Sequence, residues 1–115
     1  MSTWQRIYSH LKNRGFDVYS PGQHQGECTS PYVVLKDAGA SKFDSFSSAK
    51  HLYDLMCYVP KEVFSTLEPF VDSVETAMKE MYPEVIPLHF RTPSYLDDSV
   101  KAHMISTQYQ NNKKL

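Results

Sequence analysis

The chain has 115 residues, of which 41% are hydrophobic and 13% aromatic, a composition typical of one folded domain with a modest core. Twelve lysine and arginine residues against thirteen acidic residues give a formal charge of −1, which lacks the basic excess of a dedicated nucleic-acid-binding protein. A membrane-spanning helix is excluded because no run of about 18 apolar residues occurs. The N-terminus lacks the apolar core of a signal peptide, so we expect a soluble, cytoplasmic, single domain over residues 1–115.

The first predicted element is a helix near the N-terminus. Thr3 is placed to cap it, and Gly15 stands where a helix C-terminal glycine is expected. Between these positions apolar side chains recur on one face at steps of three and four: Trp4, Ile7, Tyr8 and Leu11. This spacing predicts a helix that packs on a core. A short extended segment follows around Phe16 and Val18, and residues 20–31 have the Gly, Pro and Ser content of a loop.

Two apolar runs predict strands, Pro31–Lys36 and the more strongly patterned Lys50–Val59. The second run has two largely apolar faces, with Tyr53, Leu55, Cys57 and Val59 on one and Leu52, Asp54, Met56 and Tyr58 on the other. We therefore expect a central strand covered on both sides, either by its own chain or by a neighbouring subunit. Residues 37–48 are small and polar without a regular period, which predicts a long exposed loop or ribbon tip of the kind that often binds partners.

The longest apolar pattern runs from Pro60 to Pro83 and predicts the main helix, which Pro83 ends. Ser65 and Glu68 have the spacing of a capping box, which would start the regular helix there. Pro69 conflicts with a helix interior. The conflict disappears if Glu68 caps a helix that begins at Pro69 and residues 61–67 form a separate turn.

After Pro83 the sequence returns to strand patterns. Residues 85–91 alternate, but Pro87 has no N–H and restricts this strand to a sheet edge or a break. Residues 92–99 form a connection, residues 100–108 a last strand, and the polar tail 109–115 is expected to fray unless a partner orders it. The predicted fold is α+β: a small, mostly antiparallel or mixed sheet with the N-terminal helix and one long helix packed on one face.

No pattern of catalytic or metal-binding residues emerges. The five histidines are scattered, and His51 and Asp54 would lie on opposite faces of a strand. The Asp97-Asp98 pair is best explained as a solvated turn. Cys28 and Cys57 match no metal motif, and we expect two reduced thiols, with one disulfide as the open alternative. The sequence therefore predicts no enzyme, no cofactor and no metal site.

Five segments in this order carry a family resemblance. They are the N-terminal helix ending in Gly15-Phe16, the strand Pro31-Tyr-Val-Val-Leu, the strand Leu52-Tyr-Asp-Leu, the long helix Val63–Tyr82 and the ending Asp97-Asp98…His103-Met-Ile-Ser106…Tyr109. In element order and composition the chain resembles the small tail-terminator and tail-completion proteins of tailed bacteriophages and phage-like particles. The resemblance covers most of the chain and includes no catalytic signature.

The resemblance implies a non-enzymatic structural protein of the virion tail. Such proteins form a ring, commonly a hexamer, that caps the head-proximal end of the tail tube, stops its polymerisation and offers a docking surface for the neck or collar. The implied partners are further copies of the chain, the tube protein and, in some particles, sheath and neck proteins, with DNA only as passing cargo. A head-completion or neck protein and a small ligand- or nucleic-acid-binding module are the open alternatives.

Loop composition suggests where such contacts lie. We expect the interface to include aromatic and charged residues of the 37–48 segment, the tail and one further aromatic: Lys42, Phe43, Asp44, Phe46, Lys50, Tyr95, Lys113 and Lys114. Phe43 and Phe46 have two interpretations that the sequence does not separate. They either order on assembly as part of an arm or fill the core of their own monomer.

Overall fold

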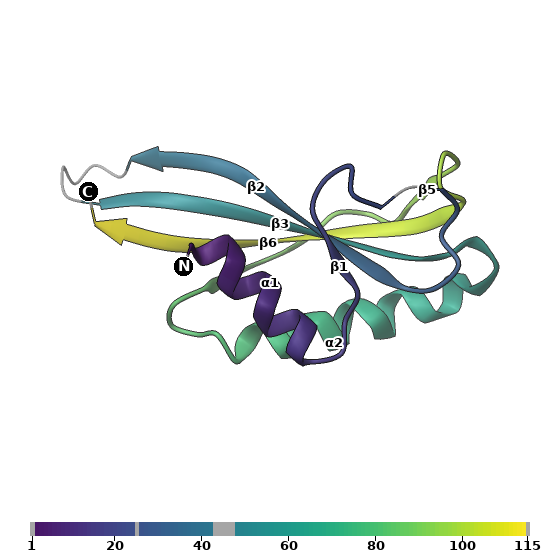
Figure 1. Cartoon of the computed structure of the whole chain (residues 1–115), viewed down its shortest axis with the longest axis horizontal. Coiled ribbons are helices and arrows are strands. Elements are labelled where there is room, and N and C mark those ends of the chain that lie inside the picture. The colour runs from purple at the N-terminus through teal and green to yellow at the C-terminus, as the bar shows by residue number, and fades with distance from the viewer. Residues whose placement is uncertain (1, 25, 43–47, 115) are drawn as a thin grey trace.

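The computed structural model describes residues 2–24, 26–42 and 48–114 and has a mixed sheet of six strands with helices on one side (Figure 1). The elements are α1 (Thr3–Asn13), β1 (Val18–Tyr19), β2 (Tyr32–Lys42), β3 (Ser48–Pro60), the 3-10 helix η1 (Lys61–Thr66), α2 (Leu67–Lys79), β4 (Ile86–Arg91), β5 (Tyr95–Asp97) and β6 (Ala102–Lys114). The predicted α+β fold is confirmed. No helix in the described ranges is long and apolar enough to cross a membrane.

The sheet is built on three long neighbouring strands. Its order is β1-β2-β3-β6-β4, and β5 also pairs with β6 beyond the end of β4. The β1–β2 pair is parallel, and the other pairs are antiparallel. Because β3 pairs with β6 over its whole length and with β2 from Ala49 to Tyr58, it is the central strand that its apolar pattern predicts.

The helix α1 begins one residue earlier than predicted. Ser2, not Thr3, is the N-cap, and the Ser2 hydroxyl and the Gln5 side chain each bind the other residue's backbone N–H in a capping box. Thr3 is instead buried in the first turn. The predicted C-terminal glycine is confirmed, since Gly15 has φ +90° and the N–H of Phe16 bonds back to the carbonyl of Leu11 at 3.1 Å.

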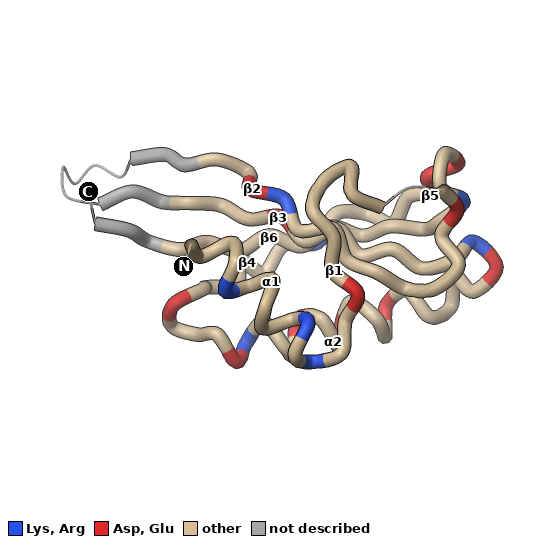
Figure 2. The backbone as a smooth tube through the Cα atoms, viewed as in Figure 1, with Lys and Arg blue, Asp and Glu red and all other residues tan. Residues whose placement is uncertain are grey.

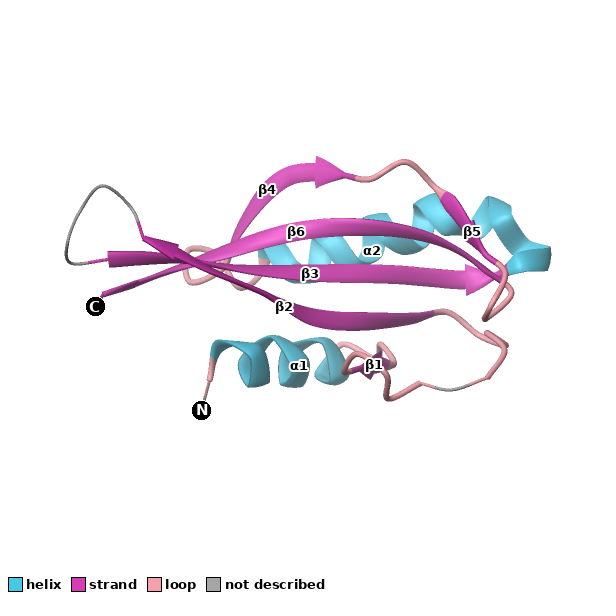
Figure 3. Cartoon of the chain, turned by 90° about the horizontal axis from the view of Figure 1, so that it is seen from above, coloured by secondary structure: helices cyan, strands magenta, loops and turns pink. Residues whose placement is uncertain are grey.

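The core lies between the sheet and both helices. The predicted inward face of β3, from Tyr53 to Val59, is at most 1% exposed and packs with Ile7 and Leu11 of α1 and with the apolar face of α2. Figure 3 shows α1 beside β2 and α2 running under the other half of the sheet. The opposite face of β3 is only half-buried, with the loop over residues 20–30 covering one end. The prediction that both faces of β3 are covered by its own chain is therefore wrong.

The segment from Pro60 to Pro83 is divided in two, which confirms the prediction of a separate turn before the regular helix, although that helix starts at Leu67 and not at Pro69. Val63 has φ −124° and ψ 44°, which are not helical, so residues 61–66 form η1 and the regular helix α2 starts at Leu67. The capping box from Ser65 to Glu68 is absent, since Thr66 is the N-cap and makes no side-chain cap. Pro69 costs nothing as the third helical residue, because that N–H would have no helical partner. The helix ends at Lys79, four residues before Pro83, which was predicted to end it.

Residues 37–48, predicted to be a long loop or a ribbon tip, form paired strands where they are described, which agrees with a ribbon and not with a loop. The tail, predicted to fray, is a strand through Lys114. Residues 37–42 continue β2, residue 48 begins β3, and residues 109–114 continue β6. Together they make a three-stranded extension, which we call the arm: Gly39–Lys42, Ser48–Leu52 and Gln110–Lys114. Figures 1 and 3 show the arm projecting past the N-terminus of α1, beyond both helices. Strand pairing needs only backbone groups, so polar side chains do not prevent it.

Both long edges of the sheet are protected outside the arm. The edge of β2 is covered by β1 at Val33 and by Trp4, whose indole N–H donates to the carbonyl oxygen of Leu35 at 3.0 Å. At the other edge β4 contains Pro87, as predicted, and its pairing with β6 is irregular between Pro87 and Arg91, where His89 has φ +54°. A bulged, proline-containing edge is a poor template for another strand.

Candidate interaction surfaces

The described residues contain no arrangement typical of catalysis. No group of three or more His, Cys, Asp or Glu side chains among them is placed to hold a metal ion. The Asp97 carboxylate accepts bonds from the backbone and hydroxyl of Ser99 at 3.0 and 2.6 Å, which completes a turn. Cys57 is fully buried, and burial raises the pKa of its thiol to about 12, so it stays protonated at neutral pH.

The predicted interface residues fall into three groups. The strand register places four lysine positions on three adjoining strands near the end of the arm: Lys50 pairs with Ser41 and Asn112, Lys113 with Ala49, Lys114 with Ser48, and Lys42 with Ala49. Phe43, Asp44 and Phe46 lie outside the described residues. Tyr95 lies on β5, far along the sheet from the arm. The structure therefore unites the two lysine-bearing segments, which are distant in sequence, and separates Tyr95 from them.

Large apolar side chains are also exposed, on η1, after the end of α2, and on β4 and β5. The large hydrophobic side chains that are exposed in the described residues all belong to the stretch between residues 63 and 96: Val63 40%, Phe64 51%, Tyr82 65%, Phe90 57%, Tyr95 53% and Leu96 37%. The Phe64 ring packs edge-on against His103 at 4.6 Å, and Leu96 pairs with His103 in the sheet. Phe90 on β4 and Tyr95 and Leu96 on β5 place three of the six at this edge of the sheet, where exposed apolar side chains suit a protein–protein contact.

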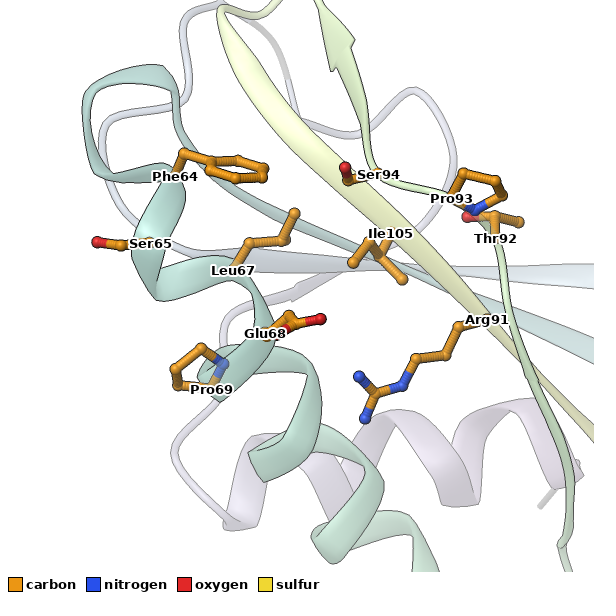
Figure 4. A pocket seen from close by; sticks show the side chains of 10 residues that line it. All are labelled: Phe64, Ser65, Leu67, Glu68, Pro69, Arg91, Thr92, Pro93, Ser94 and Ile105. Carbon is orange, nitrogen blue, oxygen red and sulfur yellow. The ribbon is translucent and has the colours of Figure 1, made fainter.

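A cavity of about 650 Å³ opens beside Phe64 (Figure 4). We call it the α2 groove; it is lined by Phe64, Ser65, Leu67, Glu68, Pro69, Arg91, Thr92, Pro93, Ser94 and Ile105. Figure 4 shows Leu67 and Ile105 between two walls, one from the start of α2 and one from the chain that joins β4 to β5. The groove exists because the chain after Arg91 leaves regular pairing with β6 and resumes it only at Tyr95.

The polar side of the α2 groove is an ion-pair cluster centred on Arg91. The guanidinium donates to Glu75 at 2.5 and 3.1 Å and to Asp72 at 2.6 Å. These hydrogen bonds, the one to Glu75 first, raise the pKa of Arg91 above its ordinary value. Since two carboxylates neutralise Arg91 through its Nε and one terminal nitrogen, it is a poor site for an anionic ligand. The exposed carboxylate of Glu68 forms no ion pair with any described residue.

The opposite face of the sheet carries an aromatic column. The rings of His24 and Tyr32 stack at 4.1 Å, and those of Tyr32 and Tyr58 at 4.8 Å, with interplanar angles of 14° for both. Tyr19 packs edge-on against His24 and Tyr32. This column fastens the 20–30 loop to the sheet, which explains how that face is partly covered.

Sequence reasoning missed the groove and the contacts of His51. His51 Nε2 lies 2.9 Å from Asp37 Oδ1 across the β2–β3 pair, and the His51 ring stacks on Tyr53 at 4.8 Å. Both features depend on strand register. The one local signal for the groove is Pro93, which follows a strand and interrupts backbone pairing.

Comparison with known proteins adds no assignment. Neither a protein-family model nor a curated protein matches the sequence.

Proposed function

We propose that this protein is a structural assembly protein of a phage or phage-like tail, whose copies form a ring that caps the head-proximal end of the tail tube. The ring would end tube polymerisation and offer a docking surface for the neck or collar. The resemblance of the sequence to tail-terminator proteins suggests this role. The arm and the apolar side chains exposed among the described residues suit protein contacts and support it.

The arm is the observation that carries the proposal. Its β2 segment, Gly39–Lys42, pairs with β3 on one side and with no strand on the other among the described residues. Elsewhere the β2 edge is covered by β1 and Trp4, and the β4 edge is bulged. An unprotected strand edge tends to pair with another chain. Because the other edges of this sheet are protected, the open edge of the arm is best explained as a contact surface for another molecule.

Two distinct surfaces on one chain suit a ring. The arm lies at one end of the long axis, and the molecule measures 48 × 25 × 24 Å. Contacts between two different patches on successive copies are heterologous, and they close into a ring when the rotation between copies permits it. Figure 2 shows acidic and basic residues intermixed over the helix side. The described part of that side therefore has no large patch of one charge sign.

The test measures assembly with and without the tube protein. We expect a ring-sized species of the purified protein, or of its mixture with tube protein, by light scattering and negative-stain microscopy. The matched variant replaces residues 41–50 by an Asn-Gly turn, which closes the β2–β3 hairpin after the Ala40–His51 pair. This variant should keep the circular dichroism of the wild type and lose the ring.

Three outcomes would count against the proposal. A wild-type protein that stays monomeric and binds no tube protein would refute it. Binding to a neck or portal protein with no effect on tube length would support a head-completion role instead, since such a protein could use the same surfaces. A stoichiometric small ligand in the α2 groove would favour the binding-module alternative.

A further inference from the structure

The α2 groove combines an apolar floor with an acidic rim. Glu68 lines the groove, and Asp72 and Glu75 lie beside it, both ion-paired to the guanidinium of Arg91. Glu68 itself is exposed. Two negative charges are therefore uncompensated at the rim. An occupant that fits this site has apolar side chains for the floor and positive charges beside them.

The end of the arm has that chemistry. The strand register places Lys42 and Lys50 on the two strands that lead into the β2–β3 connection, with Lys113 and Lys114 on the adjoining strand. The connecting residues 43–47 contain two phenylalanines, Phe43 and Phe46, and one acid, Asp44. The segment thus offers aromatic side chains flanked by lysines, with a net positive charge at neutral pH.

The arm of a chain does not reach the groove of the same chain. Ile105 in the groove pairs with Cys57 of β3, and Cys57 lies nine positions along the strand from Ser48 at the end of the arm. At the rise of a β-strand this separation is roughly 30 Å. Figure 1 shows the arm and the start of α2 at opposite ends of the sheet. Any contact between the two surfaces therefore joins different molecules.

We propose that the end of the arm of one copy docks in the α2 groove of the next copy. The lysines then meet the carboxylate rim, and the aromatic side chains of the connection enter the apolar cavity of about 650 Å³. The contact is heterologous, and it leaves one free arm and one free groove on every open chain of copies. This inference rests on the proposed ring and names the surfaces that build it.

The test uses one variant with a defective arm and two variants with a defective groove. In the arm variant Lys42→Glu and Lys50→Glu reverse two charges; in the groove variant Glu68→Lys reverses one. A second groove variant, Ser94→Trp, fills the cavity from an exposed position on its wall. The control Asp17→Lys reverses an exposed carboxylate beside β1, at the other edge of the sheet. Circular dichroism checks the fold, and sedimentation velocity measures assembly of the full-length chain.

We expect the arm variant and both groove variants to need at least a tenfold higher protein concentration than the wild type and the Asp17→Lys control to form rings. A mixture of the arm variant and the Ser94→Trp variant retains one good arm and one good groove. It should therefore form a 1:1 heterodimer and stop there, because the remaining surfaces are defective.

The outcomes separate this inference from the ring itself. Rings that form normally in all three variants would overturn the inference and leave the proposed function standing. Loss of binding to double-stranded DNA by the arm variant, with assembly unchanged, would also overturn it and assign the lysines to nucleic acid. A wild-type protein that assembles neither alone nor with tube protein would overturn both.

Discussion

Replacing Trp4 by phenylalanine should weaken the protected edge of β2. The indole N–H of Trp4 donates to the carbonyl oxygen of Leu35 at 3.0 Å, and Leu35 is fully buried. Phenylalanine keeps an aromatic ring against Tyr8, whose ring lies 5.4 Å from that of Trp4, but it has no donor. The variant therefore leaves a buried carbonyl on the strand edge without its partner.

The expected cost follows from the hydrogen bond alone. A buried acceptor that loses its donor destabilises a protein by about 1–2 kcal/mol. For a chain of 115 residues this lowers the melting temperature by roughly 4–8 °C. Thermal and urea unfolding, followed by circular dichroism at equal concentrations of variant and wild type, measure both quantities.

Tyr8→Phe is the matched control, because it removes one polar atom from the same aromatic pair and keeps the ring. Its melting temperature should stay within about 2 °C of the wild type, since no hydrogen bond of the Tyr8 hydroxyl is found among the described residues. Equal melting temperatures for Trp4→Phe and Tyr8→Phe would refute the claim that Trp4 seals this edge.

Two further predictions concern the faces of the sheet. Leu55→Ala, at a fully buried position facing the helices, should lower the free energy of unfolding in urea by about 3–4 kcal/mol. Met56→Ala, on the half-buried face, should lower it by less than about 2 kcal/mol. Equal losses would mean that both faces are covered alike, by a partner or by the loop. Burial raises the pKa of both thiols, so alkylation at pH 8 should be slow in the native protein. Cys28 in the loop should react first, and Cys57 only on unfolding; faster labelling of Cys57 would contradict its placement in the core.

The sequence by itself determined the elements whose patterns are local. The apolar face of α1, the glycine that ends it and the inward face of β3 from Tyr53 to Val59 all follow from side-chain period, and the structure confirms them. Pro87 likewise restricted β4 to an edge without any knowledge of its neighbours. Side-chain periodicity and proline act within a few residues, so their effects can be predicted from the sequence without knowledge of the fold.

Only the tertiary structure decided the arm and the α2 groove. The polar segments 37–42 and 109–114 have no strand pattern of their own, but β3 lies between them and supplies backbone partners on both sides. The groove needs residues near 65, 92 and 105 to meet at one place. Backbone pairing does not depend on side-chain polarity, and it joins segments that are far apart in the chain. Local sequence patterns therefore do not predict these two surfaces.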